Sequence, residues 1–231
     1  MKKHAYSLIA LGIFIVPFAF SFDAKTNFWP HWPAAALAMS LTGLLYLFWD
    51  SLVVRRGDWT FNPTYTGTWR IFDLPAGEIL FFIAGPFACL FLFEVIHHWF
   101  PPVELWSMNP ATLFAGALVF VFGTWLFRHL GYTALALGSV AMSLSTLGLA
   151  HPAVVGLSSF WIWFGVCCVA FVLFDGLCTA LPTLWYNPKA VTGIRIGSIP
   201  LEDFFYNFSY LGLTLSFYLL FDGWFNPLVA G

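Results

Sequence analysis

Charge is scarce in this chain. Its 231 residues include 9 Lys and Arg and 11 Asp and Glu, so that 9% are charged, against roughly 25% in an ordinary soluble domain. So few charges cannot cover a globule in water, which excludes a soluble enzyme and a disordered tail. The net charge of −2 also leaves no basic surface for a nucleic acid.

Paired cysteines and nucleotide-binding loops are missing as well. Cys89, Cys167, Cys168 and Cys178 lie in apolar runs without C-x-x-C spacing. They therefore indicate packing residues, with neither a disulfide framework nor a zinc site. No G-x-G-x-x-G occurs, which excludes a dinucleotide-binding fold. We expect no cofactor.

What the chain has in excess is apolar surface. Hydrophobic residues make up 60% and aromatic residues 21%, and the mean hydropathy is +0.83. A helix needs about 17 to 25 mostly apolar residues to cross a bilayer. We therefore predict an all-α membrane bundle of about seven transmembrane helices, at about 5–22, 34–54, 76–97, 111–127, 132–150, 158–181 and 203–221.

Two connecting segments are long, about 55–75 and 182–200, and both carry charge, Asn-Pro and Gly. If the amino terminus is cytoplasmic, Lys25 is the one basic residue of nine on the outer side, and basic residues favour the cytoplasmic side. We therefore predict a cytoplasmic amino terminus, cytoplasmic long loops and an outer carboxyl terminus. A cleavable secretory signal in the first 22 residues is the alternative.

Residues of the two halves match at one spacing of 125, without gaps. The matches include Asp50 and Asp175, Asn62 and Asn187, Pro63 and Pro188, Arg70 and Arg195, Pro75 and Pro200, and Glu78 and Asp203. This predicts a first repeat over 1–106, a linking transmembrane helix within 107–130 and a second repeat over 131–231. One helix between two three-helix units makes the copies parallel, so their loops open on the same face. The repeat also argues against cleavage of the first helix.

Acidic side chains begin the third and seventh helices. An ionisable group deep in a bilayer costs at least about 2.5 to 3.5 kcal/mol, so it faces protein or water. Singly, Glu78, Glu202 or Asp203 is explained equally well as a helix-terminal charge, but their paired occurrence favours a site. Glu202 and Asp203 point about 100° apart, so we expect one to face a shared cavity and the other to pair with Arg195 or Arg70.

Each long loop has the same order of residues: aromatic-Asn-Pro, then Arg, then Pro and an acid followed by rings. Asn-Pro alone indicates a turn, and many rings belong to a lipid-facing belt. Only rings beside the motifs are therefore site candidates. The candidate supporting residues are Asp50, Asp175, Asn62, Asn187, Arg70, Arg195, Glu94, Phe81, Phe82, Phe205 and Tyr206.

These motifs occupy 48–50, 57–63, 74–82, Glu94, 185–187 and 193–206. They resemble the heterodimeric-type lycopene cyclases, and more closely the bacterial form with both small subunits fused in one chain. The resemblance implies an enzyme of the bacterial cytoplasmic membrane that turns the ψ ends of lycopene into β-rings without redox change, giving γ-carotene and then β-carotene. It also implies that lycopene and other hydrophobic carotenoids, the lipid bilayer and other carotenoid-synthesis enzymes are partners.

One position departs from that family's pattern. The family's first motif reads Pro-x-Glu-Glu, whereas this chain has Gly77 before Glu78, at the place of Glu202 in the other copy. Acid chemistry at the first site then rests on Glu78 alone or is lost. We expect Glu202 to be the proton donor, with Glu78 and Asp203 as base or charge stabilisers, and aromatic faces to stabilise the transient cation.

Other membrane-protein classes fit less well. The seventh helix has no lysine for a retinal Schiff base, and no closely spaced aspartates exist to hold a diphosphate through magnesium. No i, i+4 histidine pair occurs, so we expect no metal site at His31, His97, His98 and His151. A small repeat-built transporter with intramembrane carboxylates is the alternative function.

Overall fold

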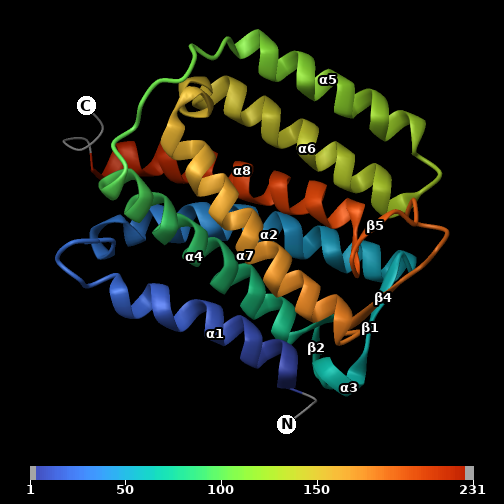
Figure 1. The fold of residues 1–231 in the computed structure, drawn as a ribbon. Coiled ribbons are helices and arrows are strands. Elements are labelled where there is room, and N and C mark those ends of the chain that lie inside the picture. Colours follow the sequence, from blue (N-terminus) through green and yellow to red (C-terminus); the bar gives the residue numbers. More distant parts are fainter. Residues whose placement is uncertain (1–3, 227–231) are drawn as a thin grey trace.

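Long helices form the molecule. The computed structural model describes residues 4–226, and within them seven long helices pack side by side (Figure 1). They are α1 (Ala5–Phe20), α2 (Trp32–Arg56), α4 (Ala76–Trp99), α5 (Pro110–Leu126), α6 (Gly131–Ala150), α7 (Ser158–Ala180) and α8 (Leu201–Phe225). The short helices are η2 (Trp29–His31), α3 (Pro63–Thr66) and η3 (Pro152–Gly156). The predicted all-α membrane bundle is confirmed.

Length distinguishes two groups of helices. Within the described residues, α2, α4, α6, α7 and α8 are long and apolar enough to cross a bilayer, whereas α1 and α5 have 16 and 17 residues. The count of seven crossings therefore stays a prediction. Large apolar side chains point outward, such as Leu118, Leu149 and Leu173 at 68%, 77% and 70% exposure. Such surfaces suit lipid and not water.

Proline, asparagine and glycine set several helix ends. Pro75 and Pro200 immediately precede α4 and α8, where a missing N–H costs nothing. The Asn109 side chain accepts a hydrogen bond from the Ala111 amide at 2.9 Å and so caps α5. Helix α2 ends at Gly57, whose φ of 78° suits a residue without a Cβ.

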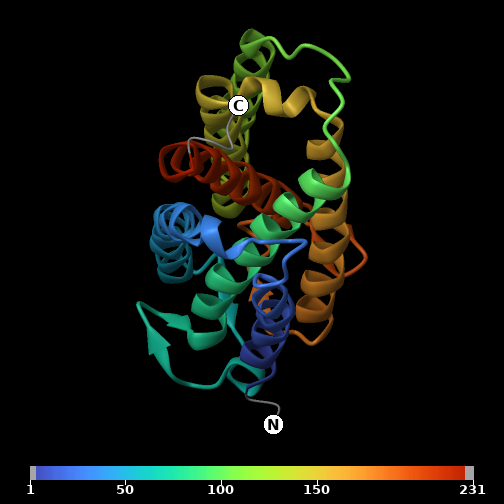
Figure 2. The ribbon, with the colours of Figure 1, turned by 90° about the vertical axis from the view of Figure 1, so that its left-hand side faces the viewer.

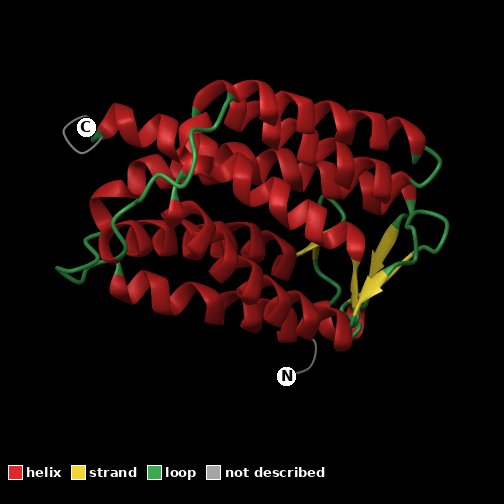
Figure 3. Ribbon diagram, turned by 45° about the horizontal axis from the view of Figure 1, so that its top comes forward, coloured by secondary structure: helices red, strands yellow, loops and turns green. Residues whose placement is uncertain are grey.

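Three short antiparallel ladders lie together at one end of the bundle (Figure 3). The ladder of β1 (Trp59–Phe61) and β4 (Leu184–Tyr186) joins the two halves of the chain. The others are local hairpins, β2 (Arg70–Ile71) with β3 (Leu74–Pro75), and β5 (Arg195–Ile196) with β6 (Ile199–Pro200). Both long loops thus fold at the same end.

The repeat of 125 residues is visible in the fold. That shift carries α2, α4, β1, β2 and β3 onto α7, α8, β4, β5 and β6 within a few residues, while α5 has no counterpart. Helices α1 and α6 begin 126 residues apart. Because the matching hairpins lie at the same end, the two units run in the same direction. The bounds 1–106, 107–130 and 131–231 stay a prediction.

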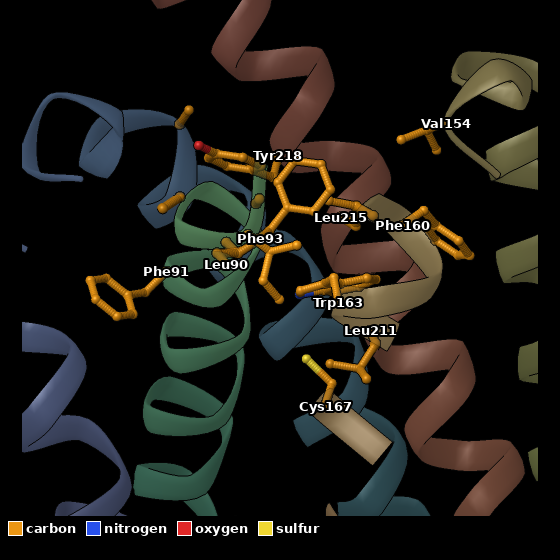
Figure 4. Close-up of a cluster of buried hydrophobic side chains, with 14 of the residues drawn as sticks. Leu90, Phe91, Phe93, Val154, Phe160, Trp163, Cys167, Leu211, Leu215 and Tyr218 are labelled. Carbon is orange, nitrogen blue, oxygen red and sulfur yellow. The ribbon is translucent and has the colours of Figure 1, made fainter. Parts of the chain in front are cut away.

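Helices α4 and α8, one from each repeat, lie at the centre of the bundle. Helix α4 contacts α1, α2, α7 and α8, and α8 contacts α2, α4 and α6; Figure 2 shows α8 between α2 and α6. An apolar cluster between α4, α7 and α8 includes Trp163 and Leu215, both almost fully buried (Figure 4). The Trp163 ring nitrogen donates a hydrogen bond to the Cys89 carbonyl at 2.7 Å, which ties α7 to α4.

We expect Trp163→Ala to lower the free energy of unfolding by about 3 kcal/mol or more, because it removes a buried ring and leaves a cavity. Denaturation of the purified protein in detergent measures this. Trp125→Ala is the matched control, since Trp125 is 57% exposed on α5. Equal losses in the two variants would contradict the packing described here.

Candidate active site

Four carboxyl groups surround one small cavity near the end of the bundle that carries the loops. Asp50 comes from α2, Glu78 from α4, Asp175 from α7 and Asp203 from α8. The cavity has a volume of about 70 Å³. The 125-residue shift relates Asp50 to Asp175 and Glu78 to Asp203, so each repeat contributes one pair of acids to a single site.

Within each pair the two acids come from different helices and line the same cavity. An ionised carboxylate only accepts hydrogen bonds, whereas a protonated carboxyl group can also donate one. Acids gathered around one cavity can therefore supply both a proton donor and a proton acceptor, which an acid/base reaction needs.

Tyrosine hydroxyls hold three of these acids in place. Tyr6 donates to Glu78 Oε2 at 2.7 Å and Tyr206 donates to Asp50 Oδ1 at 2.7 Å. Asp203 accepts two hydrogen bonds, from Tyr132 at 2.5 Å and from Tyr186. Because two donors stabilise its ionised form, Asp203 is the acid of the site whose negative charge is best stabilised.

The phenol of Tyr186 lies on β4, outside the helices that are long enough to cross a bilayer. Burial and the nearby Asp203 charge raise the pKa of this phenol well above its usual value. Tyr186 therefore keeps its proton at neutral pH and remains a donor to Asp203.

Sequence analysis missed Tyr6 and Tyr132 as site residues, although each is the second residue of its helix, α1 or α6. They are 126 residues apart, whereas the motifs repeat at 125. An ungapped comparison at one spacing passes over them. A comparison that allows a one-residue insertion would have paired them.

The two halves of the site differ at one ring. Tyr206 donates to Asp50, but the residue 125 positions earlier is Phe81, which has no hydroxyl to offer Asp175. Asp175 Oδ2 accordingly receives no hydrogen bond from an N–H or O–H group of the described residues. Phe81 instead stacks on Phe174, with ring centroids 5.0 Å apart.

Aromatic rings form the walls between the acids. Phe81, Phe171, Phe174 and Trp59 all line the cavity. Trp59 meets Tyr132 edge to face, with centroids 4.7 Å apart. Ring faces attract a positive charge, and their bulk excludes water from the carboxyl groups.

Another side chain fills the space beside Gly77. A Cβ added at Gly77 would lie 2.6 Å from a carbon of the Tyr6 ring, closer than packed atoms allow. The Tyr6 ring therefore occupies the space of a side chain at 77, and its hydroxyl reaches Glu78. The departure from Pro-x-Glu-Glu thus exchanges a neighbouring acid for a neighbouring tyrosine.

Glu202, the expected proton donor, lies apart from the four acids. It is 1% exposed and is not among the residues that line the cavity. Its Oε1 accepts hydrogen bonds from Thr133 Oγ1 at 2.7 Å and from the amide and hydroxyl of Thr192 at 2.7 and 2.8 Å. These contacts tie the second loop to α6 and α8. Of the two adjacent acids, the cavity receives Asp203.

The sequence predicts that whichever of Glu202 and Asp203 turns away from the cavity pairs with Arg195 or Arg70, but within residues 4–226 neither arginine forms a salt bridge with these acids. Arg70 donates to the Gly67 carbonyl at 2.8 Å, and Arg195 donates to the Ser198 carbonyl at 2.6 Å. Arg195 also lies over the Tyr186 ring at 5.5 Å. Both arginines thus order their own loops.

The two asparagines brace the halves against each other. Asn62 Nδ2 donates to the Pro182 carbonyl at 2.9 Å, and Asn187 Nδ2 donates to the Gly57 carbonyl at 3.0 Å. Gly57 and Pro182 are themselves 125 residues apart, so the bracing is reciprocal. These two hydrogen bonds hold the β1–β4 ladder beside the cavity, although neither asparagine lines the cavity.

Three further candidates lie away from the site. Glu94 accepts from Tyr218 at 2.6 Å towards the other end of α4, and Phe205 packs against Phe120. Phe82 lies behind the cavity wall, edge to face with Tyr210. Among residues 4–226 no group of three His, Cys, Asp or Glu side chains is placed to hold a metal ion.

Comparison with known proteins identifies a family model that matches most of the chain. The family model described as lycopene cyclase matches residues 3–96 and 131–221. A curated bifunctional lycopene cyclase/phytoene synthase of Aspergillus oryzae is 25% identical in an alignment of 77 residues that covers 31% of this chain. The match spans only 13% of that relative's length. No solved structure matches the chain.

We expect Gly77→Ala to destabilise the protein by about 1 to 3 kcal/mol, because the added Cβ pushes the Tyr6 ring off its place. Thermal denaturation in detergent measures the loss. Gly12→Ala on α1 is the matched control, since no atom lies within 4 Å of its Cβ. In a Tyr6→Ala background Gly77→Ala should cost nothing more, and an unchanged penalty there would contradict the explanation.

Proposed function

The chain belongs to the lycopene cyclase family, and we propose from this premise that it cyclises the linear ψ end groups of lycopene to β-rings. The observation that carries the proposal is the set of four carboxyl groups, one pair from each repeat, in a single ring-lined cavity. The lycopene cyclase named among the relatives supports the same substrate. Carotenoid biosynthesis and an integral membrane location follow.

The reaction needs one proton given and one proton taken. The acid transfers a proton to the terminal double bond of the ψ end, which leaves a tertiary carbocation. The internal alkene attacks that cation and closes the six-membered ring, and the ring cation then loses a proton to the base. No electron leaves or enters, so substrate and product are isomers, and the enzyme is an intramolecular lyase or isomerase.

The hydrogen bonds suggest which pair does which step. Asp203 is the base in this proposal, because Tyr132 and Tyr186 both stabilise its carboxylate. The Asp50–Glu78 pair is the acid, because each of its carboxyl groups accepts a hydrogen bond from a single tyrosine, Tyr206 or Tyr6. Rings such as Phe81 and Trp59 shield the cation from water, which would otherwise trap it as an alcohol.

Glu202 acts in this proposal by holding the second loop and the start of α8. Its contacts with Thr133 and Thr192 fix the turn of helix that presents Asp203. It is therefore a positioning residue, and its role as direct proton donor stays the competing prediction.

The distribution of basic residues supports the proposed orientation. Arg55, Arg56, Arg70, Arg128, Lys189 and Arg195 all belong to the end that carries the loops. Lys25 lies beyond the far end of α1, and Lys2 and Lys3 lie outside the described residues. Under the positive-inside rule, the loops, the active site and the amino terminus face the cytoplasm and the carboxyl terminus lies outside. Contact with other carotenoid-synthesis enzymes on this face is part of the proposal.

We expect Asp203→Asn and Glu78→Gln to lower the cyclisation rate by roughly 100-fold or more, the usual worth of a general acid or base. Glu202→Gln should cost much less, because a Gln oxygen still accepts from the threonines. Expression in lycopene-accumulating cells, with chromatography of the pigments, measures all three.

Two outcomes would change the assignment. A loss in Glu202→Gln as deep as in Asp203→Asn would restore Glu202 as the proton donor. Full β-carotene synthesis by every acid variant would remove the carboxyl mechanism. Proton-coupled solute uptake by the purified protein in vesicles, without any effect on carotenoids, would favour the transporter.

Because both repeats contribute their acids to one cavity, only one end group of the substrate reacts at a time. We expect γ-carotene to appear before β-carotene, and we expect Tyr132→Phe, which removes one donor to Asp203, to raise the γ-to-β ratio at early times. A time course of pigments in vesicles containing lycopene tests this. Appearance of β-carotene with no γ-carotene phase at any protein concentration would contradict the single site.

A further inference from the structure

An apolar groove of about 380 Å³ continues from the acid cavity. The two spaces share the side chains of Phe81, Phe171, Phe174, Asn207 and Tyr210. Helices α4 and α8 contribute to the groove, together with α1 and α7 on its two sides. These five side chains therefore form the boundary at which the acid cavity meets a space lined by apolar side chains.

The groove opens towards lipid. Among its lining residues on α7, Ala170 is exposed and Leu173 is 70% exposed. The other lining side chains of α4 and α7 include the small residues Gly85, Ala88 and Cys167. A molecule dissolved in the bilayer can thus reach the acid cavity sideways, without passing through water.

The place that the repeat relates to the groove is closed. There Tyr46, Phe82, Tyr206 and Tyr210 pack ring to ring between α2, α4 and α8, for example Tyr46 with Tyr210 at 4.9 Å between centroids. The 125-residue shift relates these four rings to Phe171, Asn207, Phe81 and Gly85.

The change from large to small side chains opens the groove. Gly85 stands for Tyr210, and Ala88 stands for Leu213, which is 2% exposed in the closed cluster. The groove side therefore lacks two rings, with Asn207 in place of Phe82 and Gly85 in place of Tyr210, and has the smaller Ala88 in place of Leu213. Interiors of this kind are normally filled, so a groove retained at this place indicates an occupant.

We propose that the groove holds the polyene body of the substrate, which enters from the bilayer between α1 and α7 with its end group in the acid cavity. This inference rests on the proposed cyclase function. A polyene is the occupant that fits, because the lining is apolar and the groove is continuous with the cavity of the carboxyl groups. A larger hollow of about 570 Å³ beside α2 and the β2–β3 hairpin shares no residue with the acid cavity and so lacks that continuity.

The test fills the groove with the side chain that closes the other repeat. Ala88→Leu copies Leu213 into the first repeat, and Ala170→Phe fills the lipid-facing mouth. Ala84→Leu is the control for the first, because Ala84 lies four residues earlier on α4 and lines a hollow that shares no residue with the acid cavity. Val169→Phe is the control for the second, because Val169 is exposed on α7 and does not line the groove.

Turnover and pigment retention are measured separately. Cyclisation is followed in vesicles containing lycopene, and retention is the lycopene absorbance that remains with protein purified in an Asp203→Asn background. We expect Ala88→Leu and Ala170→Phe to lower both by about tenfold or more, since a displaced end group no longer reaches the acids. Both controls should match their parent protein.

The outcomes separate the groove from the chemistry. If wild-type protein cyclises lycopene and the two groove variants do so at the wild-type rate, the groove assignment falls and the cyclase function stands. If wild-type protein makes no cyclic product, the function itself falls. A groove variant that loses turnover but retains as much lycopene as its control would also overturn the assignment, because the polyene then binds elsewhere.

Discussion

Burial of carboxyl groups inside an apolar bundle is the constraint on which this structure depends. Burying four carboxyl groups among rings is costly unless each finds a proton or a donor. The fold meets this demand by directing tyrosine hydroxyls at Glu78, Asp50 and Asp203, with two of them at Asp203. The result is a cavity in which four buried acids meet hydroxyl donors from both repeats.

Duplication supplies the pairing. One unit offers an Asp near the end of its second helix and an acid in the first turn of its third, and the second unit offers the same. Because the units are parallel, all four acids reach the same end of the bundle. The reciprocal bonds of Asn62 and Asn187 and the β1–β4 ladder fix the halves in register, which a site divided between two units requires.

Sequence alone could predict the helices and the repeat, since long apolar runs and polar residues at a fixed spacing are local signals. It could also place Glu78 and Asp203 at helix starts. It could not choose between Glu202 and Asp203, because that choice depends on where Thr192 returns from its loop to meet Glu202. Nor could it find Tyr6 and Tyr132, whose role arises from packing between helices and not from a motif.

The two repeats differ in the size of their side chains at two places that matter for the site. At 77 the first repeat has Gly where the second has Glu202, and the freed space admits Tyr6. At 85 it has Gly where the second has Tyr210, and the freed space is the groove. On the other side of the repeat, Tyr46, Phe82, Tyr206 and Tyr210 fill the equivalent space, and Tyr132 and Tyr186 hold Asp203. The differences between the repeats thus leave one side of the site filled with rings and the other side open as the groove.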